Sequence, residues 1–254
     1  MSAIAIIVKR DMLCYMRDKS YFISSVFRPI LWLIVIGFGI GSVFQTGGMD
    51  WRKFIFPGMI GMAIIFTSVF FGMSIIWDRQ FGFLKVILVA PVPRVYVVLG
   101  KMVSGSIIST VQGAFVLMLA PLLNVPLSLP KVLFTIVLMF IGSMALTALG
   151  IFIASRMESF EGFGMIMNFV LMPMFFLSGA LFPIDKVPKA MYWIVMLNPV
   201  TYCVDALQYA LLADLNSNIV FDAIDFPIIF NVIIIITFTI LIALLAGANF
   251  SRNK

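Results

Sequence analysis

Histidine is absent from the sequence, and this absence limits what the other reactive side chains could do. It excludes a histidine general base, Ser–His and Cys–His nucleophilic pairs, and an imidazole ligand for zinc. The eleven Asp and Glu residues lie near the ends of long apolar runs, whereas ion-driven carriers usually place ionisable groups within the membrane. No stretch matches G-x-x-x-x-G-K-[ST], the loop that binds nucleotide phosphates. The sequence therefore argues against an enzyme, a carboxylate-relay carrier and a chain that hydrolyses ATP alone.

The apolar runs themselves dominate the sequence. Hydrophobic residues make up 63% of the 254 residues and charged residues 11%, compared with roughly 25% charged residues in ordinary globular domains. Each run has about the 20 residues needed to cross roughly 30 Å of hydrocarbon, and a backbone inside a bilayer must satisfy its amides within a helix. We therefore expect one all-α polytopic membrane domain over residues 1–254. Its six predicted transmembrane helices lie near 23–44, 54–76, 95–120, 132–154, 163–182 and 226–248.

The positive charges predict the orientation of these spans. All but five of the seventeen Lys and Arg residues fall in one set of alternate connections. The five exceptions are Arg52, Lys53, Lys131, Lys186 and Lys189. Because positive connections are retained in the cytoplasm, we expect six spans in the plasma (inner) membrane with both termini cytoplasmic. Cys14 and Cys203 would then lie on opposite sides of the membrane, and the net charge of +6 reflects topology and attraction to membrane lipids rather than nucleic acid.

The connection between the second and third predicted spans carries a helical pattern followed by a proline turn. Phe81, Leu84 and Leu88 recur at helical spacing, and Pro91 and Pro93 then end any helix. This pattern predicts a short amphipathic helix at the cytoplasmic surface. Docking of a partner and simple anchoring of the loop at the membrane are both compatible with it.

The N-terminal segment, residues 1–22, also has an amphipathic pattern. Ile4, Ile7 and Met12 lie on one side of a helix, and basic residues such as Lys9 lie on the other. This arrangement predicts an interfacial helix. A gating or docking role and lipid anchoring are alternative interpretations.

The outer connection between the fifth and sixth predicted spans is the longest one. Residues 191–197 are apolar but too few to cross a bilayer, and Asn198 followed by Pro199 predicts a helix start with Asn as the cap. We expect short re-entrant helices that dip into the outer leaflet or lie on it. They could form a gate or an inert cover.

Taken in order, the motifs in these segments resemble those of the membrane subunit, or permease, of type 2 ATP-binding-cassette (ABC) exporters. With the six-span layout, the resemblance covers nearly the whole chain. The matching residues are Arg79-x-x-Gly82-x-Leu84 leading to Leu88-Val-Ala-Pro-Val-Pro-Arg94, Leu177-Ser-Gly-Ala-Leu-Phe-Pro183, and Asn198-Pro-Val-Thr-Tyr202 followed by Ala206-Leu-Gln-Tyr-Ala210.

The resemblance implies a permease that pairs with a second copy or a related chain, and that works with two separate ABC ATPase subunits. ATP and magnesium would be held by those ATPases, and no cofactor is expected in this chain. The helix at 79–90 would be a coupling helix seated in a groove of the ATPase, with the N-terminal helix beside it. The residues assigned to ATPase coupling are Arg79, Phe81, Gly82, Phe83, Leu84, Lys85 and Leu88.

The resemblance further implies that the outer helices form a gate above the translocation path. The residues assigned to this outer gate are Leu177, Ser178, Gly179, Phe182, Pro183, Asn198, Pro199 and Tyr202. The sequence departs from its relatives at one place. They often carry an acidic residue near the positions of Lys85 and Val86, so the charge partner on the ATPase could differ here.

The composition of the spans bears on the cargo and on other functions. The spans are rich in Phe, Met and Ile, which suits an amphipathic, lipid-linked or drug-like cargo better than a free ion. Gly37-x-x-x-Gly41 and the series Gly105, Ser109, Gly113 would allow close helix packing. A channel-forming oligomer should show a ring of polar residues, and a lipid-modifying enzyme should show clustered acids or a histidine at one interface. Neither pattern is evident in the sequence.

Overall fold

The computed structural model describes residues 3–40, 51–82, 93–182, 189–212 and 227–252, and every regular element within these ranges is a helix. This confirms the all-α class. The elements are α1 (Ala3–Arg17), α2 (Lys19–Trp32), the π-helix η1 (Leu33–Ile40), α3 (Trp51–Phe71), α4 (Met73–Gln80), α6 (Arg94–Leu117), the short 3-10 helix η2 (Ala120–Leu123), α7 (Leu129–Ala154), α8 (Phe160–Phe176), α9 (Lys189–Leu197), α10 (Pro199–Leu212) and α11 (Ile228–Arg252).

Four helical stretches in the described part of the chain are long and apolar enough to cross a membrane. They are Trp51–Gln80, Arg94–Leu117, Leu129–Ala154 and Ile228–Asn249. These stretches overlap the second, third, fourth and sixth expected spans. The first expected span contains the shorter apolar helix Phe27–Gly37, and the fifth overlaps the shorter apolar helix Phe160–Phe176. The structure therefore fits an α-helical membrane protein, and the full six-span layout stays a prediction.

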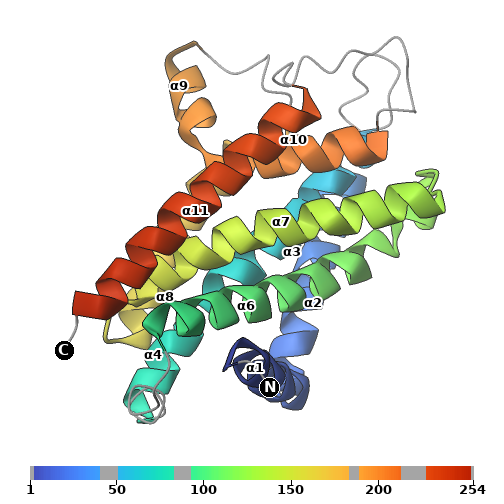
Figure 1. Ribbon diagram of the computed structural model, residues 1–254. Helices are drawn as coiled ribbons and strands as arrows, with labels where there is room; N and C mark the ends of the chain where they lie inside the picture. The colour runs from blue at the N-terminus through green and yellow to red at the C-terminus, as the bar shows by residue number, and fades with distance from the viewer. Residues whose placement is uncertain (1–2, 41–50, 83–92, 183–188, 213–226, 253–254) are drawn as a thin grey trace.

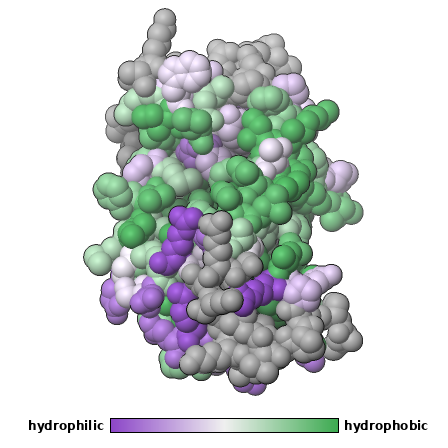
Figure 2. Space-filling view, turned by 60° about the vertical axis from the view of Figure 1, so that its left-hand side comes forward, coloured by the Kyte–Doolittle hydropathy of each residue, from purple (hydrophilic) through white to green (hydrophobic). Residues whose placement is uncertain are grey.

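The helices are arranged around a central group formed by α3, α6 and α7 (Figure 1). Helix α11 packs along α7, and α1 packs against α6 at the lower end of the view, where α4 also lies. Helices α9 and α10 lie at the opposite end. On the face shown in Figure 2, hydrophobic residues cover the middle of the molecule and strongly hydrophilic ones gather toward the lower end. The charged end is therefore the end that holds α1 and α4.

Two glycines bring the backbones of two central helices into direct contact. A Cβ atom on Gly72, between α3 and α4, would lie 2.3 Å from the carbonyl carbon of Gly150 in α7. A Cβ atom on Gly150 would lie 2.3 Å from the carbonyl oxygen of Val69. Real Cβ atoms do not approach so closely, so this crossing requires glycine on both sides.

The small residues that the sequence singled out have unequal roles. A Cβ atom on Gly105 would lie 2.6 Å from both Phe71 and Thr147, so the predicted close packing is present in α6. At Gly37 it would make only an ordinary contact, 3.5 Å from Ile55. The second residue of that motif, Gly41, lies outside the described residues.

The N-terminal segment contains a break that the sequence pattern did not show. The expected interfacial segment 1–22 comprises α1 and the first turn of α2, because α1 ends at Arg17 and α2 begins at Lys19. Within the first expected span, α2 contains Pro29 and continues as the π-helix η1 from Leu33. Proline removes one backbone hydrogen bond of the helix, which makes a change of helical pitch after it less costly.

Candidate functional site

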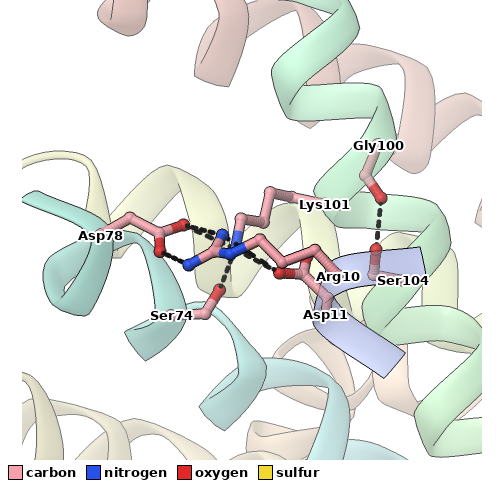
Figure 3. A network of polar contacts seen from close by, with 7 residues as sticks. All are labelled: Arg10, Asp11, Ser74, Asp78, Gly100, Lys101 and Ser104. Carbon is pink, nitrogen blue, oxygen red and sulfur yellow. Dashed lines mark hydrogen bonds and ion pairs between the residues drawn. The ribbon is translucent and has the colours of Figure 1, made fainter. Parts of the chain in front are cut away.

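Four charged side chains meet where α1, α4 and α6 converge, and we call them the charge quartet (Figure 3). Lys101 of α6 lies at the centre: its Nζ is 2.7 Å from Asp78 Oδ2 of α4 and 3.0 Å from Asp11 Oδ1 of α1. Arg10 of α1 donates from Nη1 to Asp78 Oδ2 at 3.1 Å and from Nη2 to Asp78 Oδ1. Two positive and two negative charges therefore balance one another.

Three of the quartet's four side chains are almost completely buried, and Arg10 is the more exposed member, with 30% of its side chain accessible. Lys101 is 2% exposed, Asp78 4% and Asp11 6%. The Lys101 ammonium also donates to Ser74 Oγ at 3.3 Å and lies 5.7 Å from the ring centroid of Phe71. Removing one partner from a buried ion pair leaves an uncompensated charge, which typically costs about 3–5 kcal/mol. Breaking one of the buried ion pairs of the quartet therefore costs more stability than breaking an exposed ion pair does.

The position of Gly100 explains how α1 comes near enough to take part. A Cβ atom on Gly100 would lie 3.1 Å from three side-chain atoms of Ile7, so α1 and α6 pack closely there. Arg10 and Asp11 follow Ile7 by one helical turn, and Lys101 follows Gly100 directly. The same turn of α6 is supported by Ser104, whose Oγ donates to the Gly100 carbonyl at 2.8 Å.

The two acids of the quartet are not equivalent. Both oxygens of Asp78 accept hydrogen bonds or ion pairs, whereas Oδ2 of Asp11 is buried without a hydrogen-bond partner. Burial raises the pKa of Asp11 above its ordinary value, although the positive charges of Lys101 and Arg10 oppose the shift. Both acids contact Arg10 and Lys101, but Asp78 does so through both of its oxygens and Asp11 through Oδ1 alone.

The quartet also links the two helices that flank the expected coupling segment. Asp78 lies in the last turn of α4, before that segment, and Lys101 is the eighth residue of α6, after it. Their contact closes the loop between α4 and α6 at its base. The end of α4 and the start of α6 cannot move apart, or away from α1, without stretching these ion pairs.

The coupling residues closest to α4 are fixed to another connection. Arg79 donates from Nη1 to the Met157 carbonyl at 3.1 Å and from Nη2 to the Ser155 carbonyl at 3.0 Å. Gln80 donates to the Glu158 carbonyl at 2.9 Å. These bonds join the end of α4 to the turn between α7 and α8. Arg79 thus serves packing within the chain, which its place in the motif did not indicate.

Of the remaining coupling residues, only Phe81 and Gly82 lie among the described residues. Phe81 is 73% exposed, and its ring centroid lies 5.4 Å from that of Trp77. Gly82 has a φ of +72°, a left-handed conformation that favours glycine. Phe83, Leu84, Lys85 and Leu88 lie outside the described residues, as do residues 83–90 of the helix predicted over 79–90, whereas its first two residues, Arg79 and Gln80, are the end of α4. Their role in coupling stays a prediction.

At the opposite end, the residues assigned to the outer gate lie on neighbouring segments. Asn198 joins two of them, because its Nδ2 donates to the Met174 carbonyl of α8 at 2.6 Å while its Oδ1 accepts from the Val200 amide at 3.1 Å. Asn198 is therefore the cap of α10, as predicted, and Pro199 is the first residue of that helix. Tyr202 OH donates to the Met196 carbonyl at 2.8 Å, which closes α9 onto α10.

The end of α8 contributes the other gate residues. Ser178 Oγ donates to the Phe175 carbonyl at 2.6 Å, and Gly179 adopts a φ of +78°. The Gly179 carbonyl accepts from Gln208 Nε2 of α10 at 3.1 Å. Leu177 and Phe182 are half-buried, and Pro183 lies outside the described residues. These residues hold α8 and α10 together, and whether they gate a path stays a prediction.

A second polar group crosses the interior and was not expected from the apolar spans. Thr67 of α3 donates to Gln112 Oε1 of α6, and Gln112 Nε2 donates to Tyr15 OH of α1 at 2.6 Å. One turn away, Ser68 Oγ donates to Ser109 Oγ at 2.8 Å. Helix α1 is thus joined to the central helices at two places, this one and the charge quartet.

Sequence reasoning missed the charge quartet. Its paired members are separated by up to 90 residues, so no local spacing reveals the pairing. One signal was present: Asp11 is an acid among basic residues in the N-terminal segment, next to Arg10. The cysteines add no chemistry to this site, since Cys14 is exposed, Cys203 is buried and both are free.

Comparison with known proteins identifies the group to which this arrangement is similar. A family model described as "ABC-2 type transporter" matches residues 2–212. The putative transport permease ycf38 of Cyanophora paradoxa is 28% identical over 216 residues, covering 80% of this chain and 72% of the relative. Nodulation protein J of Rhizobium leguminosarum bv. viciae is 24% identical, covering 75% and 74%. The inner membrane transport permease YadH of Escherichia coli (strain K12) is 26% identical, covering 75% of each chain.

Proposed function

The chain belongs to the ABC-2 type transporter family, and from this premise we propose that it is the membrane-spanning half of an ATP-driven exporter. Membership makes it a membrane permease subunit of an ABC transporter. The proposal adds direction, energy source and cargo. A separate ATPase subunit would dock on the connection between α4 and α6, and a second permease copy would complete the transporter.

The observation that carries this proposal is the contact between Lys101 and Asp78 at 2.7 Å. A loop that receives force from a docked ATPase must pass it to the spans rather than bend. The ion pair joins the helices on both sides of the loop, and Arg79 joins α4 to the turn before α8. Force applied to the loop would therefore move α1, α4, α6 and the α7–α8 turn as one unit.

The proposed topology has six spans and cytoplasmic termini. The first residue of α1 and the last turn of α11 lie toward the same end of the molecule (Figure 1), which an even number of spans requires. The quartet lies at that end, next to α4. The two spans beyond the four long helices would be formed by α2 with η1, and by α8 with the turn that follows it.

The proposed cargo is an amphipathic, lipid-linked or drug-like molecule that leaves the cytoplasm or the inner leaflet. The surfaces of α2, η1 and α8 expose large apolar side chains in a pattern that suits such a cargo, a second permease copy or membrane lipid. Examples are Leu31, Val35 and Phe169. Export rather than import, and the gate role of α9 and α10, rest on the family resemblance alone.

A pull-down of tagged protein from mild detergent tests the partner. The wild-type chain should retain a soluble ATPase, and a variant with Phe83→Asp and Leu84→Asp should lose it, because charges on the apolar face would prevent docking. Leu122→Asp is the matched control: Leu122 is 79% exposed in η2, at the opposite end of α6 from the loop. If the ATPase is absent from the folded wild-type protein, or is retained by the double variant, the proposal is wrong.

A further inference from the structure

A pocket of about 110 Å³ lies between α2 and α3, away from the charge quartet. Helix α2 contributes Ser24 and Arg28, and α3 contributes Met62, Phe66, Thr67 and Phe70. Five of these six side chains would be unremarkable in a membrane protein. Arg28 is the exception, because a permanent positive charge beside an apolar surface is costly unless something pairs with it.

Arg28 has no acidic partner among the described residues. The four described ion pairs all belong to the charge quartet. The described contact of Arg28 is with an aromatic ring: its guanidinium carbon lies 5.2 Å from the ring centroid of Phe66. Such a contact holds the side chain over the pocket and leaves its five N–H donors available to an anion.

The surface next to Arg28 is apolar. Phe27, Leu31, Ile34 and Val35 are between 43% and 64% exposed. Leu31 follows Arg28 by three residues and so lies on the same face of α2. A molecule held by Arg28 therefore has a path for a hydrocarbon tail along α2.

The volume of the pocket sets how much of such a molecule can enter it. Pockets that enclose a whole drug-sized ligand measure about 300–1,000 Å³, so 110 Å³ holds only one polar group. In the proposed layout Arg28 lies five residues from the start of the first span, or about 8 Å at 1.5 Å per residue. Interfacial groups lie at about this depth, near the boundary between head groups and acyl chains.

We propose that this pocket binds the anionic head group of an amphiphile, with a phosphate or carboxylate on Arg28 and the tail along α2. Arginine suits this role because its planar fork forms paired hydrogen bonds with phosphate or carboxylate. The head group comes either from a resident membrane phospholipid or from the cargo itself. Binding does not depend on the transport function, but identifying the ligand as cargo rests on that proposed function.

Binding is measured first, on the purified full chain in neutral detergent, by native mass spectrometry. The probes are lysophosphatidylglycerol, which is anionic, and lysophosphatidylcholine, which is zwitterionic. Wild-type protein should prefer the anionic probe, and Arg28→Gln should bind it roughly tenfold less tightly, as expected from losing one charge-assisted pair. Arg28→Lys should keep part of the preference.

The chain offers a matched control. Arg156 is also exposed and lies 4.5 Å from the ring centroid of Phe152, but it does not line this pocket. Arg156→Gln should leave binding unchanged. Equal losses in both variants, or equal binding of the two probes by wild-type protein, would overturn the proposal. Inorganic phosphate should compete poorly, and competition as effective as that of the lipid would show a free-anion site instead.

Two further measurements are needed, one for the case in which Arg28→Gln does not fold and one to identify the source of the ligand. Ser24→Phe should block the pocket without removing charge, so it decides the matter if Arg28→Gln fails to fold, and unchanged binding in this variant would contradict the proposal. ATP hydrolysis by the complex with the partner ATPase then separates the two sources. Stimulation by the anionic probe that Arg28→Gln abolishes identifies a cargo site, and binding without stimulation identifies a resident lipid site. The binding measurement uses the purified chain alone, so its result does not depend on an ATPase partner.

Discussion

Lys101 and Asp78 lie on opposite sides of the connection between α4 and α6, yet Nζ of the first is 2.7 Å from Oδ2 of the second. This contact makes the connection a closed loop with a charged base. Arg10 and Asp11 then attach α1 to the same base. The arrangement explains how a short segment outside the membrane could move several helices together.

The first prediction concerns the central charge. Lys101→Met should lower the thermal unfolding temperature strongly, with a loss of about 3–5 kcal/mol, because Asp11 and Asp78 would share only Arg10. Thermal unfolding of detergent-purified protein measures the effect. Lys9→Met, an exposed site on α1, should have almost none.

Restoring the charge balance should recover part of that loss. Adding Asp78→Asn to Lys101→Met leaves one positive and one negative charge, Arg10 and Asp11, which are close enough to pair. The double variant should therefore be more stable than the sum of the two single changes predicts. Simple additivity would show that the four charges do not act as a network.

The two acids should respond differently to neutralisation. Because burial raises the pKa of Asp11, this residue stabilises the folded state below its ordinary pKa and loses that contribution as pH rises through the raised value. Asp11→Asn should then lower the unfolding temperature at pH 7 by less than Asp78→Asn does, because it removes the ion pair with Lys101 but also removes the cost of burying a charged Asp11. Asp78→Asn should lower it, since both Asp78 oxygens are bonded. A larger loss for Asp11→Asn than for Asp78→Asn would contradict the assignment.

The contact between Gly72 and Gly150 predicts an unusual sensitivity to one methyl group. Gly150→Ala should destabilise the protein, because the new Cβ would lie 2.3 Å from the carbonyl oxygen of Val69 and the helices would have to separate. Gly164→Ala in α8 is the control, since no atom lies within 4 Å of its Cβ position. This change should be neutral or stabilising by up to about 1 kcal/mol. Equal effects at the two positions would rule out the close crossing.

Asn198 provides a test at the other end of the molecule. Asn198→Ser keeps a side-chain acceptor for the Val200 amide but removes the donor to the Met174 carbonyl, whereas Asn198→Ala removes both. Alanine should cost about 0.5–2 kcal/mol more than serine in thermal unfolding, the value of a helix cap. Identical unfolding temperatures for the two variants would mean that capping of α10 contributes nothing.

Much of the fold could be predicted because membrane helices follow from length and composition alone. The start of α10 at Pro199 was also readable, since a cap is a local feature. The π-helix after Pro29 was not, because the apolar run continues through it, and the one-residue break at Asp18 was not, because the charged segment around it contains no Gly or Pro that would signal a helix end. Boundaries within a continuous apolar pattern depend on tertiary contacts.

The candidate site was predicted only in outline. Sequence motifs indicated the loop after α4 and the segments around Ser178 and Asn198. They could not show that Asp78 pairs with Lys101 or that Tyr15 bonds to Gln112, because these pairs join residues far apart in the chain. The position of the acids near the ends of the apolar runs did not show that two of them, Asp11 and Asp78, are buried.

The most direct test of the account reconstitutes the permease with its ATPase in proteoliposomes and measures transport per ATP hydrolysed. The variant to compare with wild type carries Lys101→Met and Asp78→Asn, and it should still bind the ATPase because the loop residues are unchanged. We predict retained ATPase binding with a transport yield per ATP several-fold lower, since the base of the loop is no longer joined. An unchanged yield in a folded, ATPase-bound double variant would contradict the claim that the charge quartet transmits the motion.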